Sequence, residues 1–381
     1  MPTQVPLPPS YHEAGEAELK RRIEAARERL GRRLCILGHH YQQDDVIAFA
    51  DFTGDSLRLS QLAAQQTQAE FIVFCGVHFM AESADILTAP EQQVILPDLT
   101  AGCSMADMAH VDDVEAAWPM LEAWAGCPVT PITYVNSSAA VKAFVGRKEG
   151  ACCTSSNAKL VLEWALHGAR PDVGAPADAG HKVIFLPDQH LGRNTAYALG
   201  WPLESMAVYD PHQPFGGLDE ETLRRARFIL WKGHCSVHAL FKPSQVEAYR
   251  ARPEPWNVLV HPECTWEVCQ RADYVGSTEY IIRTVREAAP GTCWAVGTEI
   301  HLVNRLASVH RDRTVRSLAG VQCLCSTMYR IDLRHLAWVL DNLVDGRVVN
   351  RVQVDDETRH WARVALDRML SLVPSQPVSA R

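Results

Sequence analysis

The sequence predicts an α/β protein built from three repeated units, each with a parallel sheet. Short apolar runs, with the length and composition of buried strands, alternate with helical segments along the chain. This alternation is typical of parallel strands joined by right-handed crossovers. Similar polar clusters also return at matching points of the units. His39 and Cys103 are 64 positions apart, as are His261 and Cys325.

Each unit is expected to contain about four strands separated by helices. The strands are predicted at residues 34–37, 71–74 and 94–96 in the first unit, at 132–136, 151–153, 183–186 and 228–231 in the second, and at 258–260, before Gly276, from Cys293 and at 321–325 in the third. We expect an N-terminal tail and helix over residues 1–30, then α/β domains over 31–115, 116–240 and 241–381, the last with C-terminal helices. One cysteine at an equivalent point of each unit predicts pseudo-threefold packing, with the cysteines meeting at the axis.

The composition argues against two kinds of partner. A formal net charge of -8 and a pI near 6.1 do not suit a general nucleic-acid binder, which needs a basic surface. No apolar run approaches the roughly 20 residues of a membrane span, and the N-terminal stretch lacks the apolar core of a signal peptide. We therefore expect a cytoplasmic protein that binds neither nucleic acid nor a membrane.

The chain has twelve cysteines, most of which are expected to be buried thiols. No C-x-x-C pair is present, so a metal site would have to be assembled from distant segments. Cys103, Cys235 and Cys325 are predicted to end the fourth strands of the three units. Cys323 offers a second thiol in the third unit, and we prefer Cys325 because it keeps the 64-residue spacing.

Three thiolates from three units predict a metal centre. Fe–S clusters usually have four cysteine ligands, so a three-cysteine cluster would leave one iron open to act as a Lewis acid. Zinc held by three cysteines is the competing metal. Three unrelated buried cysteines are the structural alternative.

Hydroxyl side chains follow the second strand of each unit, at Ser56, Ser155 and Thr278. Each has the appearance of a helix N-cap, and capping alone would explain it. The N-termini of helices also bind carboxylate or phosphate groups, which an acidic protein needs to hold an anionic substrate.

Polar side chains end the first strand of each unit. They are His39, Tyr41, Tyr134, Asn136, His261 and Glu263. Together they supply acid–base groups and hydrogen-bond donors. His234 and His238 flank Cys235 and could support a metal ligand or be ordinary histidines. The Gly-rich fingerprints of dinucleotide or ATP sites are missing after the first strand.

An ordered set of motifs between residues 33 and 350 resembles the quinolinate synthase family. The motifs are HHYQ, GDSLRLS, DLTAGCSMAD, YVNSSAAVKA, CTSSNA, KGHCSVH, HPECTWEV, GSTEYII and CSTMYR. The resemblance implies three pseudo-symmetric, three-layer α/β/α domains around one [4Fe–4S] cluster held by Cys103, Cys235 and Cys325. It also implies that iminosuccinate and dihydroxyacetone phosphate condense to quinolinate, phosphate and water in the biosynthesis of NAD.

The resemblance further implies a set of substrate contacts and catalytic residues. The contacts to iminosuccinate carry over to His39, Ser56, Tyr134, Val135, Asn136, Ser155, His261, Pro262, Glu263 and Thr278. Glu263, Tyr41, His39 and His261 are the expected catalytic residues, with Glu263 carrying protons. A functional link to L-aspartate oxidase or aspartate dehydrogenase is expected, since either would supply iminosuccinate.

The chain departs from the family pattern at His40, where relatives often have Asn or Tyr, and in longer segments after Cys103 and Ser155. Only Cys323-Leu324-Cys325 stands where some bacterial members have a CxxCxxC run, so a regulatory disulfide is not expected. Two rival functions remain open at this point. One is another Fe–S hydro-lyase acting on a different hydroxy acid, and the other is a non-catalytic redox or metal sensor, which would not need the His/Tyr/Glu cluster.

Overall fold

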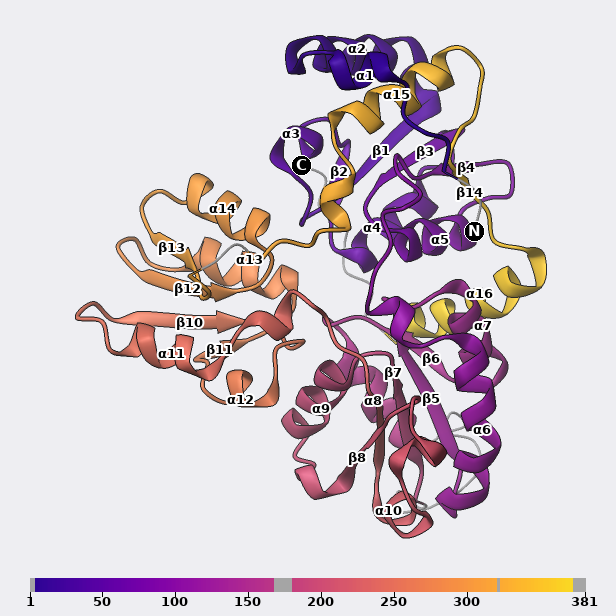
Figure 1. Cartoon of the computed structure of the whole chain (residues 1–381), viewed down its shortest axis with the longest axis vertical. Helices are drawn as coiled ribbons and strands as arrows, with labels where there is room; N and C mark the ends of the chain where they lie inside the picture. The colour runs from indigo at the N-terminus through magenta and orange to yellow at the C-terminus, as the bar shows by residue number, and fades with distance from the viewer. Residues whose placement is uncertain (1–3, 168–179, 321–322, 373–381) are drawn as a thin grey trace. The chain divides into compact units, whose positions relative to one another are not determined.

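The computed structural model describes residues 4–167, 180–320 and 323–372 (Figure 1). The chain divides into two compact units. The first unit combines residues 1–106 with 235–355, and the second combines 107–234 with 356–381. Three sheets, two of five strands and one of four, alternate with helices, which confirms the predicted α/β class.

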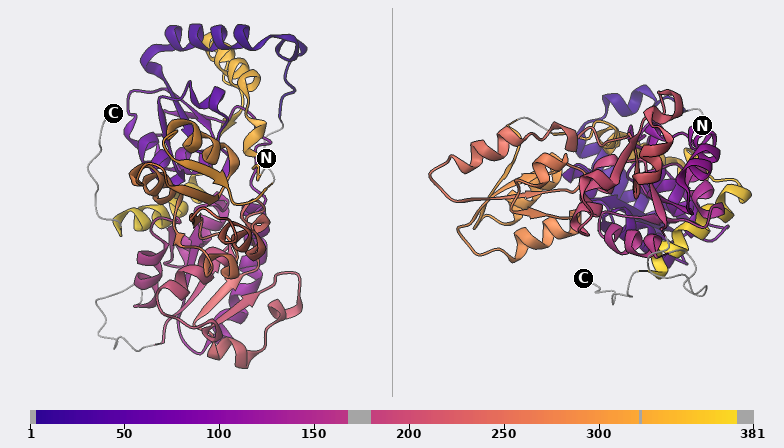
Figure 2. Two further views of the ribbon diagram at one scale, coloured as in Figure 1. Left: turned by 90° about the vertical axis from the view of Figure 1, so that its left-hand side faces the viewer. Right: turned by 90° about the horizontal axis from the view of Figure 1, so that it is seen from below.

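The first sheet belongs to the first unit and has the strand order β14-β4-β3-β1-β2. Its strands are β1 (Leu34–His39), β2 (Phe52–Gly54), β3 (Phe71–Cys75), β4 (Gln93–Ile95) and β14 (Arg351–Val352). The accompanying helices are α1 (Pro9–Glu13), α2 (Glu16–Leu30), α3 (Asp44–Ile47), α4 (Ser56–Gln65), α5 (His78–Leu87) and α15 (Leu333–Val344). Every residue of β1 and β3 is buried, as expected for central parallel strands covered on both faces. Helices α2 and α15 lie side by side (Figures 1 and 2).

The four-stranded sheet also belongs to the first unit and has the order β11-β10-β12-β13, with all pairs parallel. Its strands are β10 (Trp256–Val260), β11 (Tyr274–Val275), β12 (Cys293–Gly297) and β13 (Thr314–Ser317). Its helices are α11 (Pro243–Arg250), α12 (Trp266–Cys269), α13 (Thr278–Glu287) and α14 (Ile300–Val309). Apolar residues of α13 and α14 pack with those of β10 and β12 in one buried cluster.

The second unit is built on the sheet β6-β5-β7-β9-β8, again all parallel. Its strands are β5 (Val129–Tyr134), β6 (Ala151–Cys153), β7 (Lys182–Leu186), β8 (Met206–Tyr209) and β9 (Phe228–Trp231). Its helices are α6 (Val111–Ala125), α7 (Ala139–Arg147), α8 (Ala158–Leu166), α9 (Gln189–Ala198), α10 (Glu220–Arg225) and α16 (Asp356–Ser371). Helix α16 packs closely on α7, where a Cβ atom at Gly146 would lie 2.0 Å from the Trp361 carbonyl oxygen. Only glycine allows this approach.

The three sheets share one topology. In each, the first strand in chain order lies between the second and the third. The next strand beyond the third is β4 or β13, the fourth in chain order, in the two sheets of the first unit, and β9, the fifth, in the sheet of the second unit. The prediction of about four strands was incomplete, since β8 extends the second sheet and the antiparallel β14 extends the first. Strand β14 has only two residues, too few for a periodic signal. The domain boundaries expected from the sequence stay a prediction.

One predicted strand was wrong. The fourth strand of the β10–β13 sheet is β13, not residues 321–325. Residues 321 and 322 lie outside the described residues, whereas Cys323 and Cys325 lie in irregular backbone. The other cysteines likewise lie in loops beyond their strands, since Cys103 follows the end of β4 by eight positions and Cys235 follows the end of β9 by four. Among the described residues, no helix combines the length and the apolar character needed to cross a bilayer.

Candidate functional site

The loops that follow the first strands lie where parallel sheets bind ligands. In each sheet the chain leaves the first strand for a neighbour on one side and then continues on the other side, which makes a topological switch point. Ligands bind at the carboxyl ends of the strands at such points. His39, Tyr134 and His261 stand at equivalent places, each directly after the first-strand residue that pairs with the last residue of the third strand.

His39 and His261 are held in the same way. The backbone N–H of Tyr41 donates to Nδ1 of His39 over 3.1 Å, and the backbone N–H of Glu263 donates to Nδ1 of His261 over 3.3 Å. Burial is the main cause that lowers the pKa of each imidazole to about 3. Both rings are therefore neutral near pH 7, and each carries its proton on Nε2, where it can donate a hydrogen bond. Pro262 restricts the backbone between His261 and Glu263.

The phenol of Tyr41 lies among hydroxyl groups of the β10–β13 sheet. Its oxygen is 3.0 Å from Thr278 Oγ1 and 2.9 Å from Thr298 Oγ1. Burial raises the pKa of Tyr41, while the two hydroxyl contacts lower it by less. Tyr41 is therefore a neutral phenol at neutral pH that can donate one hydrogen bond and accept others.

A cysteine, a histidine and a carboxylate converge in the first unit. Donor atoms of Cys235, His238 and Glu263 lie within 4.8 Å of one another. His238 Nδ1 is 2.9 Å from Glu263 Oε2, and the His238 ring stacks on His261 with centroids 4.5 Å apart. Thiolate, imidazole and carboxylate can all bind transition metals. Because His238 and Glu263 are hydrogen-bonded to each other, Cys235 is the member of this set that we consider as a metal ligand.

The loop before each predicted cysteine ligand is anchored by the same backbone bond. In each case an N–H near the start of the helix after the third strand donates to the carbonyl two residues before the cysteine. The bonds run from His78 to Ala101 (2.8 Å), from Gln189 to Gly233 (3.1 Å) and from Ile300 to Cys323 (3.1 Å). By this register Cys325 occupies the position of Cys103 and Cys235, and Cys323 occupies the position of Ala101 and Gly233.

A second repeated feature follows the cysteines. A short 3₁₀ helix begins three residues after each of Cys103, Cys235 and Cys325. These helices are η2 (Ala106–Met108), η5 (His238–Leu240) and η6 (Met328–Arg330). As whole residues, Cys103, Cys235 and Cys325 are partly exposed, whereas Cys323 is fully buried in an apolar cluster. Two independent features thus distinguish Cys325 from Cys323.

The three thiols also influence one another electrostatically. The pKa of Cys103 is raised to about 12, mainly by burial and to a smaller extent by the charges of Cys325 and Glu263, while backbone hydrogen bonds from Ala106 and Met105 lower it. Burial raises the pKa of Cys235 as well, with smaller contributions from Glu263, Cys103 and Cys325. Without a cation, the thiols of Cys103 and Cys235 would stay protonated at neutral pH. A bound metal favours their thiolate forms.

The hydroxyls after the second strands do not cap their helices, so that interpretation was wrong. Asp55 caps α4 by accepting from the N–H of Arg58, and Ser277 caps α13 by accepting from the N–H of Tyr280. Ser56 and Thr278 are therefore the first residues of these helices. Ser155 lies before Asn157, the N-cap of α8. The hydroxyl of Thr278 forms a hydrogen bond with Tyr41 and does not cap α13.

The second unit carries the remaining predicted contacts after β5 and β6. Tyr134 and Val135 are buried, and the N–H of Val135 donates to the carbonyl of Cys153 over 2.9 Å. Asn136 Oδ1 is buried and has no hydrogen-bond partner among the described residues. A buried amide oxygen without a partner is uncommon and suits a site that a ligand completes.

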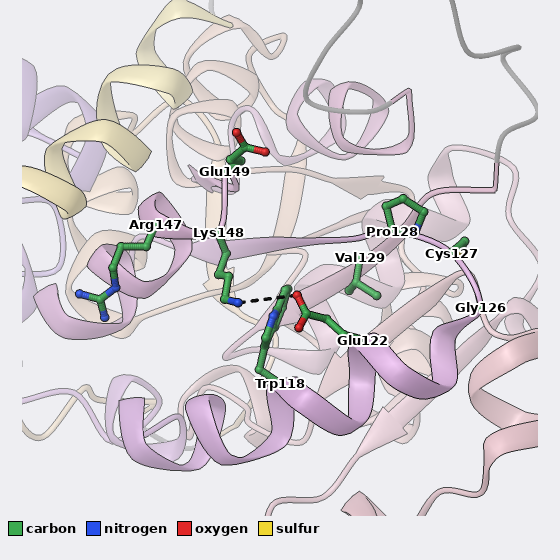
Figure 3. Close-up of a pocket in the computed structure, with 9 residues that line it drawn as sticks. All are labelled: Trp118, Glu122, Gly126, Cys127, Pro128, Val129, Arg147, Lys148 and Glu149. Carbon is green, nitrogen blue, oxygen red and sulfur yellow. Dashed lines mark ion pairs between the residues drawn. The ribbon is translucent and has the colours of Figure 1, made fainter. Parts of the chain in front are cut away.

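A separate hollow of about 630 Å³ in the second unit does not contain these residues (Figure 3). It is lined by Trp118, Glu122, Gly126, Cys127, Pro128, Val129, Arg147, Lys148 and Glu149. Its cations already have anionic partners, since Lys148 pairs with Glu122 over 3.6 Å and Arg147 pairs with Glu115 over 3.2 Å. The hollow holds no group of acid–base residues comparable to that around Tyr41 and Glu263.

Two residues that the sequence analysis missed hold the loop after β1. Arg305 of α14 donates to the carbonyls of His40 and Gln42, over 2.8 and 2.7 Å, and pairs with Asp44. Thr298 contacts Tyr41. The sequence signal for Thr298 was its position, because it directly follows the third strand of its sheet, at the same edge as His261.

Fold and site together define an α/β protein with repeated strand-end loops that can carry a thiolate-bound metal centre beside acid–base groups. A family model described as "Quinolinate synthetase A protein" matches residues 21–371. Proteins named quinolinate synthase are similar over most of the chain. That of Acidobacterium capsulatum is 56% identical over 95% of both chains, and that of Geobacillus kaustophilus is 55% identical over 96% of both. That of Nocardioides sp. is 55% identical over 96% of this chain and 91% of the relative. The chain belongs to the quinolinate synthetase A protein family.

Proposed function

We propose that this protein is a quinolinate synthase that condenses iminosuccinate with dihydroxyacetone phosphate and releases quinolinate, phosphate and water. The observation that carries the proposal is the threefold repetition of the cysteine loop, with the same anchoring bond and the same 3₁₀ helix around each thiol. Membership of the quinolinate synthetase A family supports it. The arrangement of the repeats about a central Fe–S site stays a prediction.

Cys103, Cys235 and Cys325 would hold one [4Fe–4S] cluster. Their surroundings fit a cluster, because backbone N–H groups of Ala106 and Met105 point to the sulfur of Cys103, and that of His238 points to the sulfur of Cys235. Hydrogen bonds of this kind stabilise cluster thiolates and tune their potential. When bound with one iron free of cysteine, the cluster supplies a Lewis acid for a hydroxyl or carbonyl oxygen.

The substrate contacts are proposed from the strand-end residues. They are His39, Ser56, Tyr134, Val135, Asn136, Ser155, His261, Pro262, Glu263 and Thr278. The rings of His39 and His261 would donate hydrogen bonds from Nε2 to carboxylate oxygens of the substrate. Because both rings are neutral, they would not repel a protonated nitrogen of the substrate. The N-terminus of α13, with Thr278 as its first residue, would favour a negative charge.

Glu263 is the proposed carrier of protons during dehydration. Its carboxylate is buried, lies near the Cys235 thiol and is oriented by His238. Tyr41 and His39 would assist enolisation of the triose and loss of phosphate, since Tyr41 keeps its proton and His39 stays neutral. Holding both substrates together removes much of the entropic cost of the condensation.

The reaction places the protein downstream of an enzyme that makes iminosuccinate, for which we propose L-aspartate oxidase or aspartate dehydrogenase. The product would enter NAD biosynthesis. We propose the cytoplasm as the location.

The decisive experiment is turnover by protein purified and assayed without oxygen. Iminosuccinate and dihydroxyacetone phosphate should give quinolinate and phosphate in equal amounts, detected by chromatography and a phosphate assay. Other hydroxy acids, offered one at a time, should not be dehydrated. A protein with an intact [4Fe–4S] cluster that forms no quinolinate would rule out the proposed function.

A further inference from the structure

A chain of buried polar groups connects the two acid–base residues of the first unit. It starts at Glu263 Oε2, which lies 2.9 Å from His238 Nδ1. His238 Nε2 lies 3.4 Å from Thr298 Oγ1, and Thr298 Oγ1 lies 2.9 Å from the Tyr41 hydroxyl. The four residues come from four different loops: Tyr41 follows β1, His238 follows β9, Glu263 follows β10 and Thr298 follows β12.

The directions of these hydrogen bonds follow from the chemistry of the groups. An ionised Glu263 only accepts, so His238 donates to it from Nδ1 and accepts at Nε2. The Thr298 hydroxyl then donates to His238, and its oxygen accepts the proton of Tyr41. Thr278 donates to the remaining acceptor site of Tyr41. Each hydroxyl thus has one defined orientation.

Burial stabilises this hydrogen-bond arrangement against exchange with water. The residues His238 and Thr298 are at most 1% exposed, so neither side chain can exchange its partner for bulk water. A buried donor or acceptor that loses its partner carries the full penalty of desolvation. The phenol and the carboxylate are therefore constrained through His238 and Thr298, in addition to their own loops.

We propose that Thr298 and His238 are positioning residues, which set the Tyr41 phenol and the Glu263 carboxylate in the orientation needed for proton transfer. This inference rests on the proposed function, in which Tyr41 and Glu263 act on the substrates. Neither Thr298 nor His238 is among the residues proposed to contact substrate. They act through the two residues that do.

The test compares Thr298→Val, which removes the hydroxyl at nearly constant volume, with Thr298→Ser, which keeps it. In cluster-loaded enzyme, the Val variant should lose roughly 10- to 100-fold in kcat with KM little changed, because a misplaced catalytic group mainly slows the chemical step. The Ser variant should recover most of the rate. Thr88→Val is the matched control, since it removes a buried hydroxyl that donates to the Asp85 carbonyl at the end of α5.

A second readout does not depend on turnover. 3-Fluorotyrosine placed at position 41 reports the surroundings of the phenol by its ¹⁹F resonance in the full chain. The resonance should move in Thr298→Val and stay near its wild-type position in Thr298→Ser and Thr88→Val. His238→Asn should also move the ¹⁹F resonance, because its amide can replace Nδ1 toward Glu263 but cannot reach Thr298. This variant tests the inference if Thr298→Val fails to fold.

The outcomes separate this inference from the proposed function. If wild type makes quinolinate but Thr298→Val matches Thr298→Ser in both kcat and ¹⁹F shift, Thr298 does not position Tyr41. If wild type makes no quinolinate, the proposed function fails, while the ¹⁹F comparison still decides whether Thr298 holds the phenol.

Discussion

The loops after β1 and β10 place a histidine by the same backbone bond and differ in the residue that makes the bond. His39 accepts from the N–H of Tyr41, and His261 accepts from the N–H of Glu263. The residue two places after the histidine makes this bond with its backbone N–H and not with its side chain. Its side chain can therefore vary without disturbing the histidine. One loop thereby presents a neutral phenol and the other a carboxylate. The repeated backbone bond therefore fixes the position of the histidine in both loops, and the side chain two residues later sets the chemistry of each loop.

The largest effect is expected from substitutions of the cysteines in the repeated loops. Cys103→Ala and Cys325→Ala should each lose most of the iron and sulfide, because each removes one of the three proposed ligands, which lie in equivalent loops. Cys323→Ala should keep them, since its position corresponds to Ala101 in the first loop. Iron and sulfide analysis of anaerobically purified protein, with visible absorption, makes the measurement.

Two outcomes would break the equivalence of the cysteine loops. Retention of the cluster in Cys325→Ala with its loss in Cys323→Ala would move the ligand to the buried thiol. Stoichiometric zinc in wild-type protein isolated without oxygen would replace the Fe–S assignment altogether.

The next effect tests the residue that differs between the two histidine loops. Glu263→Gln keeps the size and hydrogen bonding of the side chain but cannot exchange a proton, so turnover should fall by about 10²-fold or more. Iron content and folding should match wild type, and single-turnover assays under anaerobic conditions would measure the loss. A fall of less than about tenfold would transfer the proton-carrying role to His261 or Tyr41.

A smaller effect separates a helix cap from a substrate contact within α13. Under the proposed function, the Thr278 hydroxyl turns from Tyr41 to a charged group of the bound substrate. Thr278→Ala should then weaken substrate binding by roughly 1–3 kcal/mol. Ser277→Ala should instead lower the free energy of unfolding by about 1 kcal/mol, since Ser277 is the cap. KM values and urea unfolding of both variants form the comparison. Reversed results would return Thr278 to a purely structural role.

The smallest effect concerns pH and the helices that follow the third strands. Helix α14 is capped by the side chain of Glu299, which also hydrogen-bonds the His301 ring, whereas α5 of the first sheet has no side-chain cap. The hydrogen bond to Glu299 raises the pKa of His301 above its ordinary 6.5. Its stabilisation is therefore full below about pH 6.5 and is lost as pH rises through the folded-state pKa.

His301→Gln should make unfolding less dependent on pH in that window, by less than about 1 kcal/mol for this partly exposed pair. Urea midpoints of wild type and variant at pH 6 and pH 8 would show it. The expectation is wrong if wild type gains stability, relative to the variant, as pH rises.

Much of the fold was predictable because its signals are local. Apolar runs such as Phe71–Cys75 mark buried parallel strands, and polar residues directly after them mark the ligand-binding edge. The equal spacing of His39 to Cys103 and of His261 to Cys325 identified the first and third repeats. The loop position of the cysteines was not predictable, because the loops differ in length. Cys235 follows the end of its strand by four positions and Cys103 by eight.

Contacts between distant loops were not predictable from one sequence. Arg305 has no local pattern that separates it from an ordinary helix residue. Thr298 is marked only by its place at a strand end, which does not reveal its contact with Tyr41. Likewise, a serine or threonine before a helix predicts a cap, but whether Ser277 or Thr278 fills that place depends on backbone angles that neither residue dictates. The choice became visible only with the hydrogen bonds.

The guanidinium of Arg305 has a consequence for how the β1 loop can open. The carbonyls of His40 and Gln42 find their donors on α14 rather than on a neighbouring strand. The Gln42 side chain adds a bond to the carbonyl of Met328, in the 3₁₀ helix after Cys325. Opening of this loop therefore requires the loss of its hydrogen bonds to α14 and to the 3₁₀ helix η6. Its amides should exchange with solvent as part of one cooperative unit with α14, and Arg305→Met should turn that shared opening into a local one.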